Sequence, residues 1–84
     1  MIDDIRYLLV FARIVETGSV SGAAAALQLS AATVSSHLSK LELSMGTALL
    51  YRNTRKLSLT PAGAKLYTSA QAMQQLYANE VLAF

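Results

Sequence analysis

Apolar residues near the start of the chain recur at spacings of three and four, which is the pattern of a helix with one buried face. The stripe consists of Ile5, Leu8, Phe11, Ala12 and Val15. It predicts a helix from Asp4 to Glu16, and Gly18 is a suitable residue to end it.

The same helix has a second apolar face. Tyr7, Val10 and Ile14 lie roughly opposite the first stripe when residues are spaced 100° apart. A helix that is apolar on two sides needs two partners, so we expect contact with a long carboxy-terminal helix or with another protomer. The alternative is that these are scattered apolar residues on an ordinary surface.

Two further helices are predicted from capping residues. Ser19 is a suitable N-cap for a short helix over 20–27, and Ser30 for a longer helix from Ala31 to Met45 that Gly46 ends. The apolar stripe of the longer helix is Val34, Leu38, Leu41 and Met45. Its outer face is small, polar and nearly free of acidic residues, with Ala32, Thr33, Ser36, Ser39 and Lys40.

A hairpin and a last helix follow. Residues 49–52 and 57–59 have the composition of two short strands, and the loop between them is Asn53, Thr54, Arg55 and Lys56. Thr60 followed by Pro61 is a strong start signal for a helix, which meets no stop signal before Phe84.

The last helix has one apolar stripe that is too long for the body. The stripe consists of Leu66, Ala70, Met73, Tyr77, Val81 and Phe84. A helix of this length reaches about 36 Å at 1.5 Å per residue, whereas a body of some 60 residues has a radius of gyration of about 10 Å. The stripe therefore predicts a symmetric dimer.

Composition excludes several classes of protein. The chain has 84 residues, no Cys and a single His, His37, so no thiolate or zinc site is expected, and neither is a cofactor. The sequence shows neither a catalytic nucleophile paired with a general base nor a phosphate-binding glycine loop, so we do not expect an enzyme. No apolar run reaches the roughly 18 residues of a membrane span, and no basic leader precedes one, so we expect a cytoplasmic protein.

The distribution of charge is more informative than the net charge of +2. Residues 1–39 hold two basic and three acidic side chains, whereas residues 40–65 hold five basic side chains against Glu42 alone. The basic charge therefore belongs to the second half of the body, where the predicted hairpin lies.

Together these elements predict a mainly α fold. Two consecutive helices followed by a basic hairpin are the parts of a winged helix-turn-helix, with a three-helix body and a two-stranded wing over 1–60 and a linker or dimerisation helix over 61–84. The helix over 31–45 would enter the major groove of double-stranded DNA. Trihelical bodies also serve as protein-interaction modules without DNA contact, so that alternative stays open.

Four stretches resemble the DNA-binding domain of LysR-type transcriptional regulators over residues 5–63. Residues 16–20 resemble the family's E-x-G-S-F turn, and residues 23–27 resemble A-A-x-x-L. Residues 30–42 resemble S-Q-P-A-V/L-S-x-x-I-x-x-L-E, and residues 46–63 resemble G-x-x-L-F/L-x-R-x-x-R-x-x-x-L-T-x-A-G. The joint spacing of these fragments is highly specific.

The resemblance implies a bacterial regulator that binds double-stranded DNA as a homodimer, forms higher oligomers at full length and carries an effector-binding domain absent from these residues. Where long Gln and Arg side chains are usual in the family, this chain has Ala31 and Ser36. The residues expected to contact DNA are Ser30, Ala31, Ala32, Thr33, Ser35, Ser36, His37, Ser39, Lys40, Arg52, Thr54, Arg55 and Lys56. Those expected in the dimer are Tyr7, Val10, Ile14, Leu66, Ala70, Met73, Tyr77, Val81 and Phe84.

Some of these residues have a structural alternative. Arg52 either contacts DNA or braces the wing against Glu42, and the spacing decides neither. His37 flanks the apolar stripe of its helix and is a groove-edge or a structural residue. Arg55 and Lys56 contact phosphate or the minor groove, or are solvated charges at a loop tip.

Overall fold

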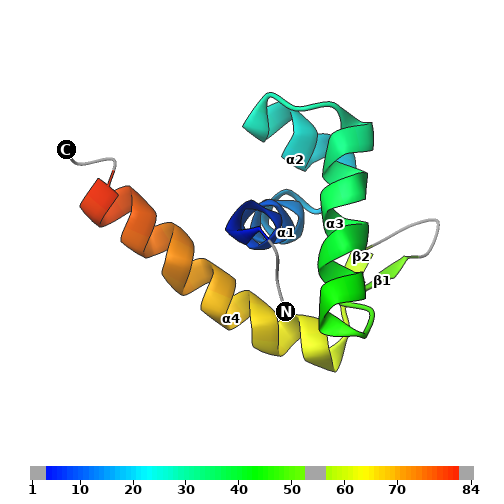
Figure 1. Cartoon of the computed structure of the whole chain (residues 1–84). Coiled ribbons are helices and arrows are strands. Elements are labelled where there is room, and N and C mark those ends of the chain that lie inside the picture. The colour runs from blue at the N-terminus through cyan, green and yellow to red at the C-terminus, as the bar shows by residue number, and fades with distance from the viewer. Residues whose placement is uncertain (1–3, 53–56, 82–84) are drawn as a thin grey trace.

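The computed structural model describes residues 4–52 and 57–81 of the chain (Figure 1). The body comprises α1 (Ile5–Thr17), α2 (Val20–Leu27) and α3 (Ala31–Met45), followed by strands β1 (Leu50–Arg52) and β2 (Leu57–Leu59). The helix α4 (Pro61–Leu76) continues into a π-helical segment, Tyr77–Val81. The mainly α, winged helix-turn-helix fold predicted from the sequence is confirmed.

Helix α1 lies at the centre of this arrangement. Figure 1 shows it end-on, with α2, α3 and α4 around it, and each of the three contacts it. The side chains of Phe11 and Ile14 have no exposed surface, and the Phe11 ring meets the Tyr67 ring of α4 edge to face at 6.4 Å between centroids. Burying an aromatic or branched side chain stabilises a fold by about 1.5–3 kcal/mol. The core is therefore organised around α1.

The burial of α1 corrects the predicted faces. Val10 and Ile14, assigned above to a second face that contacts another protomer, are 5% and 0% exposed inside the single chain, so their assignment to the dimer is wrong. Of the two partners considered, the protein's own helices cover this face. Ile5, predicted to be buried, is 60% exposed. The helical period identifies two apolar stripes but does not say that the protein's own helices cover most of both.

The helix ends follow the capping signals in the sequence. Ser19 accepts a hydrogen bond from the Gly22 amide at 2.8 Å, and Gly18 and Gly46 end their helices with φ of 80° and 71°. Helix α1 begins one residue later than predicted, because Asp4 is its N-cap and accepts from the Arg6 amide at 2.9 Å. Hydrogen bonds from the Arg6 side chain and then its amide lower the pKa of Asp4 from 3.8 to about 2.

The two strands form an antiparallel wing in which Leu50 pairs with Leu59, and Arg52 pairs with Leu57. The first strand begins at Leu50, one residue after the predicted start. Predicted contact residues Thr54, Arg55 and Lys56 fall in the loop over 53–56, which lies outside the described residues.

A tight junction joins the wing to α4. The Thr60 hydroxyl accepts from the Gly63 amide at 3.0 Å and donates to the Ala48 carbonyl at 2.8 Å. A Cβ atom on Gly63 would lie 1.9 Å from the Leu49 carbonyl oxygen. Only glycine allows α4 to pass this close to the backbone before β1. The junction fixes the direction in which α4 leaves the wing.

Helix α4 runs beneath α1 and extends past the body (Figure 1). Its α-helical part ends at Leu76, so the prediction of one regular helix is wrong over Tyr77–Val81, and the predicted continuation to Phe84 lies outside the described residues. Among the described residues no single helix has the length and hydropathy of a membrane span. Helices α1 and α2 reach these values only when they are taken together, and the pair is sharply bent.

Candidate nucleic-acid interface

The outer face of α3 is free of other elements. Val34, Leu38 and Leu41 point into the core. Away from the core the exposed residues are Ala31, Ala32, Ser35, Ser36, Ser39, Lys40 and Leu43, of which Leu43 is 83% exposed. The exposed side chains over 31–39 are small, so the first part of this face is low and is available to a large partner, and the larger Lys40 and Leu43 follow toward the end of the helix.

A short turn sets α3 against α2. Gln28 adopts a left-handed conformation with φ of 58°, and the Leu29 amide donates to the Ala24 carbonyl at 3.0 Å. Because the turn is this tight, α3 begins close to the end of α2 and its first turn stands at the surface (Figure 1). This is the arrangement of a helix-turn-helix.

Two of the predicted contact residues cap the helix. The Ser30 hydroxyl accepts from the Thr33 amide at 3.1 Å, and it donates to the Thr33 hydroxyl at 2.8 Å. The two hydroxyls are therefore bonded to each other. Thr33 is half-buried. In the structure, these two hydroxyls therefore cap the N-terminus of α3.

His37 is a packing residue between α1 and α3. It is half-buried, and its ring lies 4.8 Å from the Tyr7 ring, tilted by 45°. Lys40 places its ammonium nitrogen 5.9 Å from the centre of the same Tyr7 ring. The predicted structural role of His37 is therefore present, and Tyr7, predicted for the dimer, is half-buried against α3 of its own chain.

The wing is held to α3 by one carboxylate. Glu42 Oε2 accepts from the Leu49 amide at 2.7 Å and, at 3.4 Å, from the Leu50 amide. Its other oxygen, Oε1, accepts from Arg52 at 2.8 Å. Of the two roles considered for Arg52, the structure therefore shows bracing of the wing.

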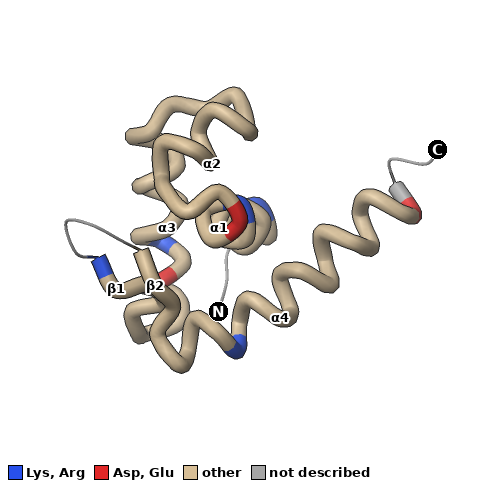
Figure 2. Tube along the Cα trace, turned by 180° about the vertical axis from the view of Figure 1, so that it is seen from behind, with Lys and Arg blue, Asp and Glu red and all other residues tan. Residues whose placement is uncertain are grey.

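Charged residues of the second half of the body lie on α3, β1 and α4. Figure 2 shows basic positions on α3, on β1 and near the start of α4, with an acidic position on α3 beside the strands. These are Lys40, Arg52, Lys65 and Glu42. Since Glu42 is bonded to the wing, the acidic charge is neutralised locally. The described residues hold no group of three or more potential metal ligands.

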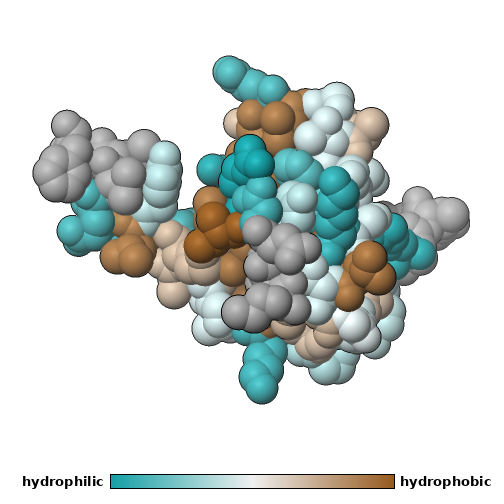
Figure 3. Space-filling view, in the orientation of Figure 1, coloured by the Kyte–Doolittle hydropathy of each residue, from teal (hydrophilic) through white to brown (hydrophobic). Residues whose placement is uncertain are grey.

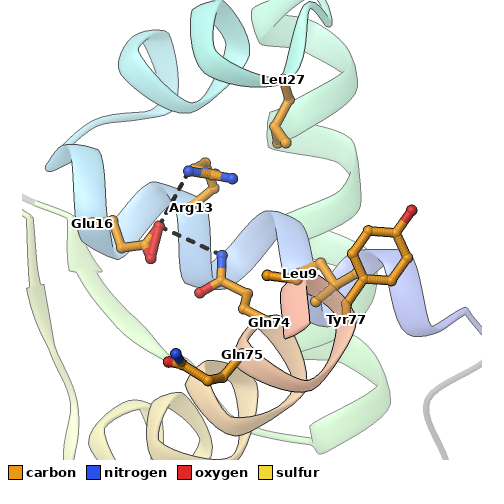
Figure 4. Close-up of a pocket in the computed structure, with 8 residues that line it drawn as sticks. Leu9, Arg13, Glu16, Leu27, Gln74, Gln75 and Tyr77 are labelled. Carbon is orange, nitrogen blue, oxygen red and sulfur yellow. Dashed lines mark hydrogen bonds and ion pairs between the residues drawn. The ribbon is translucent and has the colours of Figure 1, made fainter. Parts of the chain in front are cut away.

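A separate surface lies between α1 and the end of α4. One cleft of about 400 Å³ is lined by Leu9, Arg13, Glu16, Leu27, Gln74, Gln75, Tyr77 and Ala78 (Figure 4). In it Glu16 Oε1 accepts from Gln74 at 3.5 Å and lies 3.6 Å from Arg13 Nη1. A second cleft of about 410 Å³ is lined by Ile5, Arg6, Leu9, Met73, Leu76 and Tyr77. Leu9 and Tyr77 belong to both, so the clefts form one groove.

The groove includes Leu9 and Leu76, which the sequence did not single out, and Ile5, which was predicted to be buried. Ile5 and Leu76 are 60% and 62% exposed, and Tyr77, which was predicted, is 47% exposed. Figure 3 shows apolar surface on α4 and where α4 meets the body. Leu76 could have been found from its spacing of three from Met73, and Leu9 from its spacing of four from Ile5.

The other residues predicted for the dimer divide into three groups. Leu66 and Met73 are half-buried against the core. Ala70 is fully buried in its own chain, so its assignment to the dimer is wrong. Its small side chain allows α4 to approach the body closely. The side chain of Val81 and the whole of Phe84 lie outside the described residues.

The arrangement of the paired helices, the braced wing and the extended α4 defines a winged helix-turn-helix protein. Residues 5–64 match the family described as "Bacterial regulatory helix-turn-helix protein, lysR family". The chain therefore belongs to the LysR family, which confirms the resemblance drawn from its motifs.

Two relatives illustrate the likeness. The chain is 46% identical over 66 residues to a "Probable hydrogen peroxide-inducible genes activator" of Mycobacterium avium, covering 79% of this chain and 21% of that protein. It is 39% identical over 82 residues to the "HTH-type transcriptional activator AaeR" of Escherichia coli K12, covering 88% of this chain and 26% of that one. The chain thus spans about a quarter of the length of these relatives.

Solved structures share the fold. The BenM_DBD/catB site 1 DNA complex gives a TM-score of 0.86 at 29% identity, with 95% of this chain and 90% of that one covered. The CbnR_DBD-DNA complex gives 0.81 at 29% identity, covering 90% and 87%. Full-length AphB of Vibrio cholerae gives 0.83 at 31% identity, covering 89% of this chain and 26% of that one.

The Glu42 contacts generate a prediction about the stability of the wing. Replacing Glu42 by Gln removes the charge that strengthens three hydrogen bonds, and we expect a loss of about 1–2 kcal/mol in the free energy of unfolding. Arg52→Met should cost less than half of this, because Arg52 is half exposed and the backbone bonds survive. Urea unfolding measures both.

Glu80→Gln makes the same change at an exposed position and should leave the stability unchanged. An equal loss for Glu42→Gln and Arg52→Met would mean that the ion pair, and not the bonds to the strand amides, carries the effect.

Proposed function

We propose that this chain binds double-stranded DNA sequence-specifically, as the DNA-binding part of a transcriptional regulator acting in the cytoplasm. The observation that carries this proposal is the free outer face of α3 beside a wing held in place by Glu42. The proposal is further supported by family membership and by the similarity to the DNA-binding domains of BenM and CbnR, whose structures are DNA complexes.

The proposed contacts follow from exposure. Ala31, Ala32, Ser35, Ser36 and Ser39 are exposed on the side of α3 away from the core and would face the major groove. Lys40 at the edge of this face would contact phosphate. Of the residues outside the described part of the wing, Thr54, Arg55 and Lys56 would contact phosphate or a minor groove.

Substituting a residue in the middle of the α3 face tests DNA binding directly. Ser36→Glu places a negative charge against the DNA, and we expect affinity for a selected duplex to fall more than a hundredfold, because like charges brought together cost several kcal/mol. Gln71→Glu adds the same charge to an exposed position of α4 and should change affinity less than threefold. Fluorescence anisotropy measures both.

Salt dependence then separates DNA binding from the protein-interaction alternative. The logarithm of the affinity should fall with the logarithm of salt concentration at about 0.9 per phosphate contacted, with several contacts per protomer. A flat salt response, or no binding to any duplex at low salt, would contradict the proposal and favour a protein partner.

We further propose that two copies associate through the groove between α1 and α4. Ile5, Leu76 and Tyr77 are apolar and exposed there, around half-buried Met73, and the described part of the chain leaves them uncovered. Because α4 extends past its own body, a second copy related by a twofold axis can cover the groove of the first while its own is covered. A dimer would present two α3 helices to two half-sites.

Charge introduced into the groove should separate the copies. Leu76→Glu puts a carboxylate into the proposed interface and is expected to convert a dimer into a monomer, measured as mass by light scattering. Leu76 is 62% exposed, so the single chain should remain folded, as circular dichroism checks. Gln71→Glu on the same helix should remain dimeric. A Leu76→Glu variant with the mass of a dimer would place the association elsewhere.

A further inference from the structure

The first turn of α3 would present an unusual set of chemical groups to the major groove of DNA. Ala31 and Ala32 are exposed, and each presents a single methyl group. The hydroxyl groups of Ser30 and Thr33 are bonded to each other, and the Thr33 amide is bonded to Ser30. The Ser30 hydroxyl is therefore engaged in capping, and the exposed side chains of the first two helical positions, Ala31 and Ala32, are apolar.

The middle of the face is equally short. Ser35, Ser36 and Ser39 are exposed and none of them has a long side chain. The bidentate hydrogen bonds by which Arg reads guanine, or Gln and Asn read adenine, cannot be made from these positions. Short side chains also let the backbone of α3 approach the edges of the bases closely.

One group in the major groove matches exposed methyl groups in chemistry. Thymine carries a C5-methyl group on its major-groove edge, and Ala side chains make apolar contact with it. We propose that Ala31 and Ala32 read thymine C5-methyl groups within each half-site. This inference rests on the proposed DNA-binding function and assigns what the first turn of α3 recognises.

Methyl recognition differs from recognition of DNA shape in what it senses. Replacing thymine by uracil removes the C5-methyl group and leaves the Watson–Crick pair and the donors and acceptors of both grooves in place. A wing that reads the width of a minor groove makes no contact with this methyl group, because the methyl group lies in the other groove. The substitution therefore isolates the contact proposed for Ala31 and Ala32.

The experiment begins with a half-site selected from random duplexes. Each thymine in it is then replaced by deoxyuridine, one at a time, and the affinity of the 84-residue chain is measured. We expect a loss of about fourfold at one or two thymines, the value of one buried methyl group. At these positions a 5-methylcytosine pair should bind more tightly than the cytosine pair by a similar factor.

Substitutions in the protein identify which residue makes the contact. In Ala31→Gly or Ala32→Gly the preference for thymine over uracil should disappear at the corresponding position, even where the glycine also weakens α3 and lowers affinity for both duplexes. Ala72→Gly, an exposed position of α4, should keep the full preference. The ratio of the two affinities is the readout, so a purely structural effect leaves it unchanged.

The outcomes are distinct. Equal affinity for thymine and uracil at every position, or a selected half-site without thymine, overturns methyl recognition while leaving DNA binding intact. A preference that survives in both glycine variants overturns the assignment to Ala31 and Ala32. Absence of binding to any selected duplex contradicts the proposed function itself.

Discussion

Burial of both apolar faces of α1 is the constraint on which the rest of the structure depends. Three helices pack around it, and Phe11 and Ile14 are fully enclosed. Because one side of α3 is used for this purpose, its other side stands free. Because α4 must also cover α1, its course away from the wing is fixed, and its far end extends past the body (Figure 1).

Around this core, a few polar contacts set the finer geometry. Glu42 binds the strand amides and Arg52, so the wing keeps a fixed position beside α3. The close passage of Gly63 by Leu49 then ties α4 to the same wing. The proposed DNA-binding surface and the groove between α1 and α4 are therefore separate faces of the structure. Variants can change one without the other.

Much of the fold could be predicted from local signals in the sequence. Ser19, Ser30, Gly18 and Gly46 cap their helices as expected, because a cap depends on residues within one turn. The partners of α1 could not be predicted in this way. Val10 and Ile14 lie on the second apolar stripe, and only the packing of distant helices decides whether this chain or a partner covers that stripe.

The candidate site was predictable to a similar extent. The outer face of α3 follows from the burial of Val34, Leu38 and Leu41, which the helical period predicts. Whether Arg52 contacts DNA or pairs with Glu42 depends on where β1 places its side chain. The spacing of residues in the sequence does not give that position. The π-helical turn at Tyr77 has no sequence signal that we recognise, and it ends the regular spacing from which the dimer residues were predicted.

The central claim is that the outer face of α3 binds DNA while the groove between α1 and α4 does not. Amide chemical shifts of the isotopically labelled chain, followed by nuclear magnetic resonance as a selected duplex is added, test it most directly. The claim predicts the largest changes at Ala31, Ala32, Ser35 and Ser36, with Leu9 and Leu76 little affected. Changes concentrated at Leu9 and Leu76, with α3 unchanged, would contradict it.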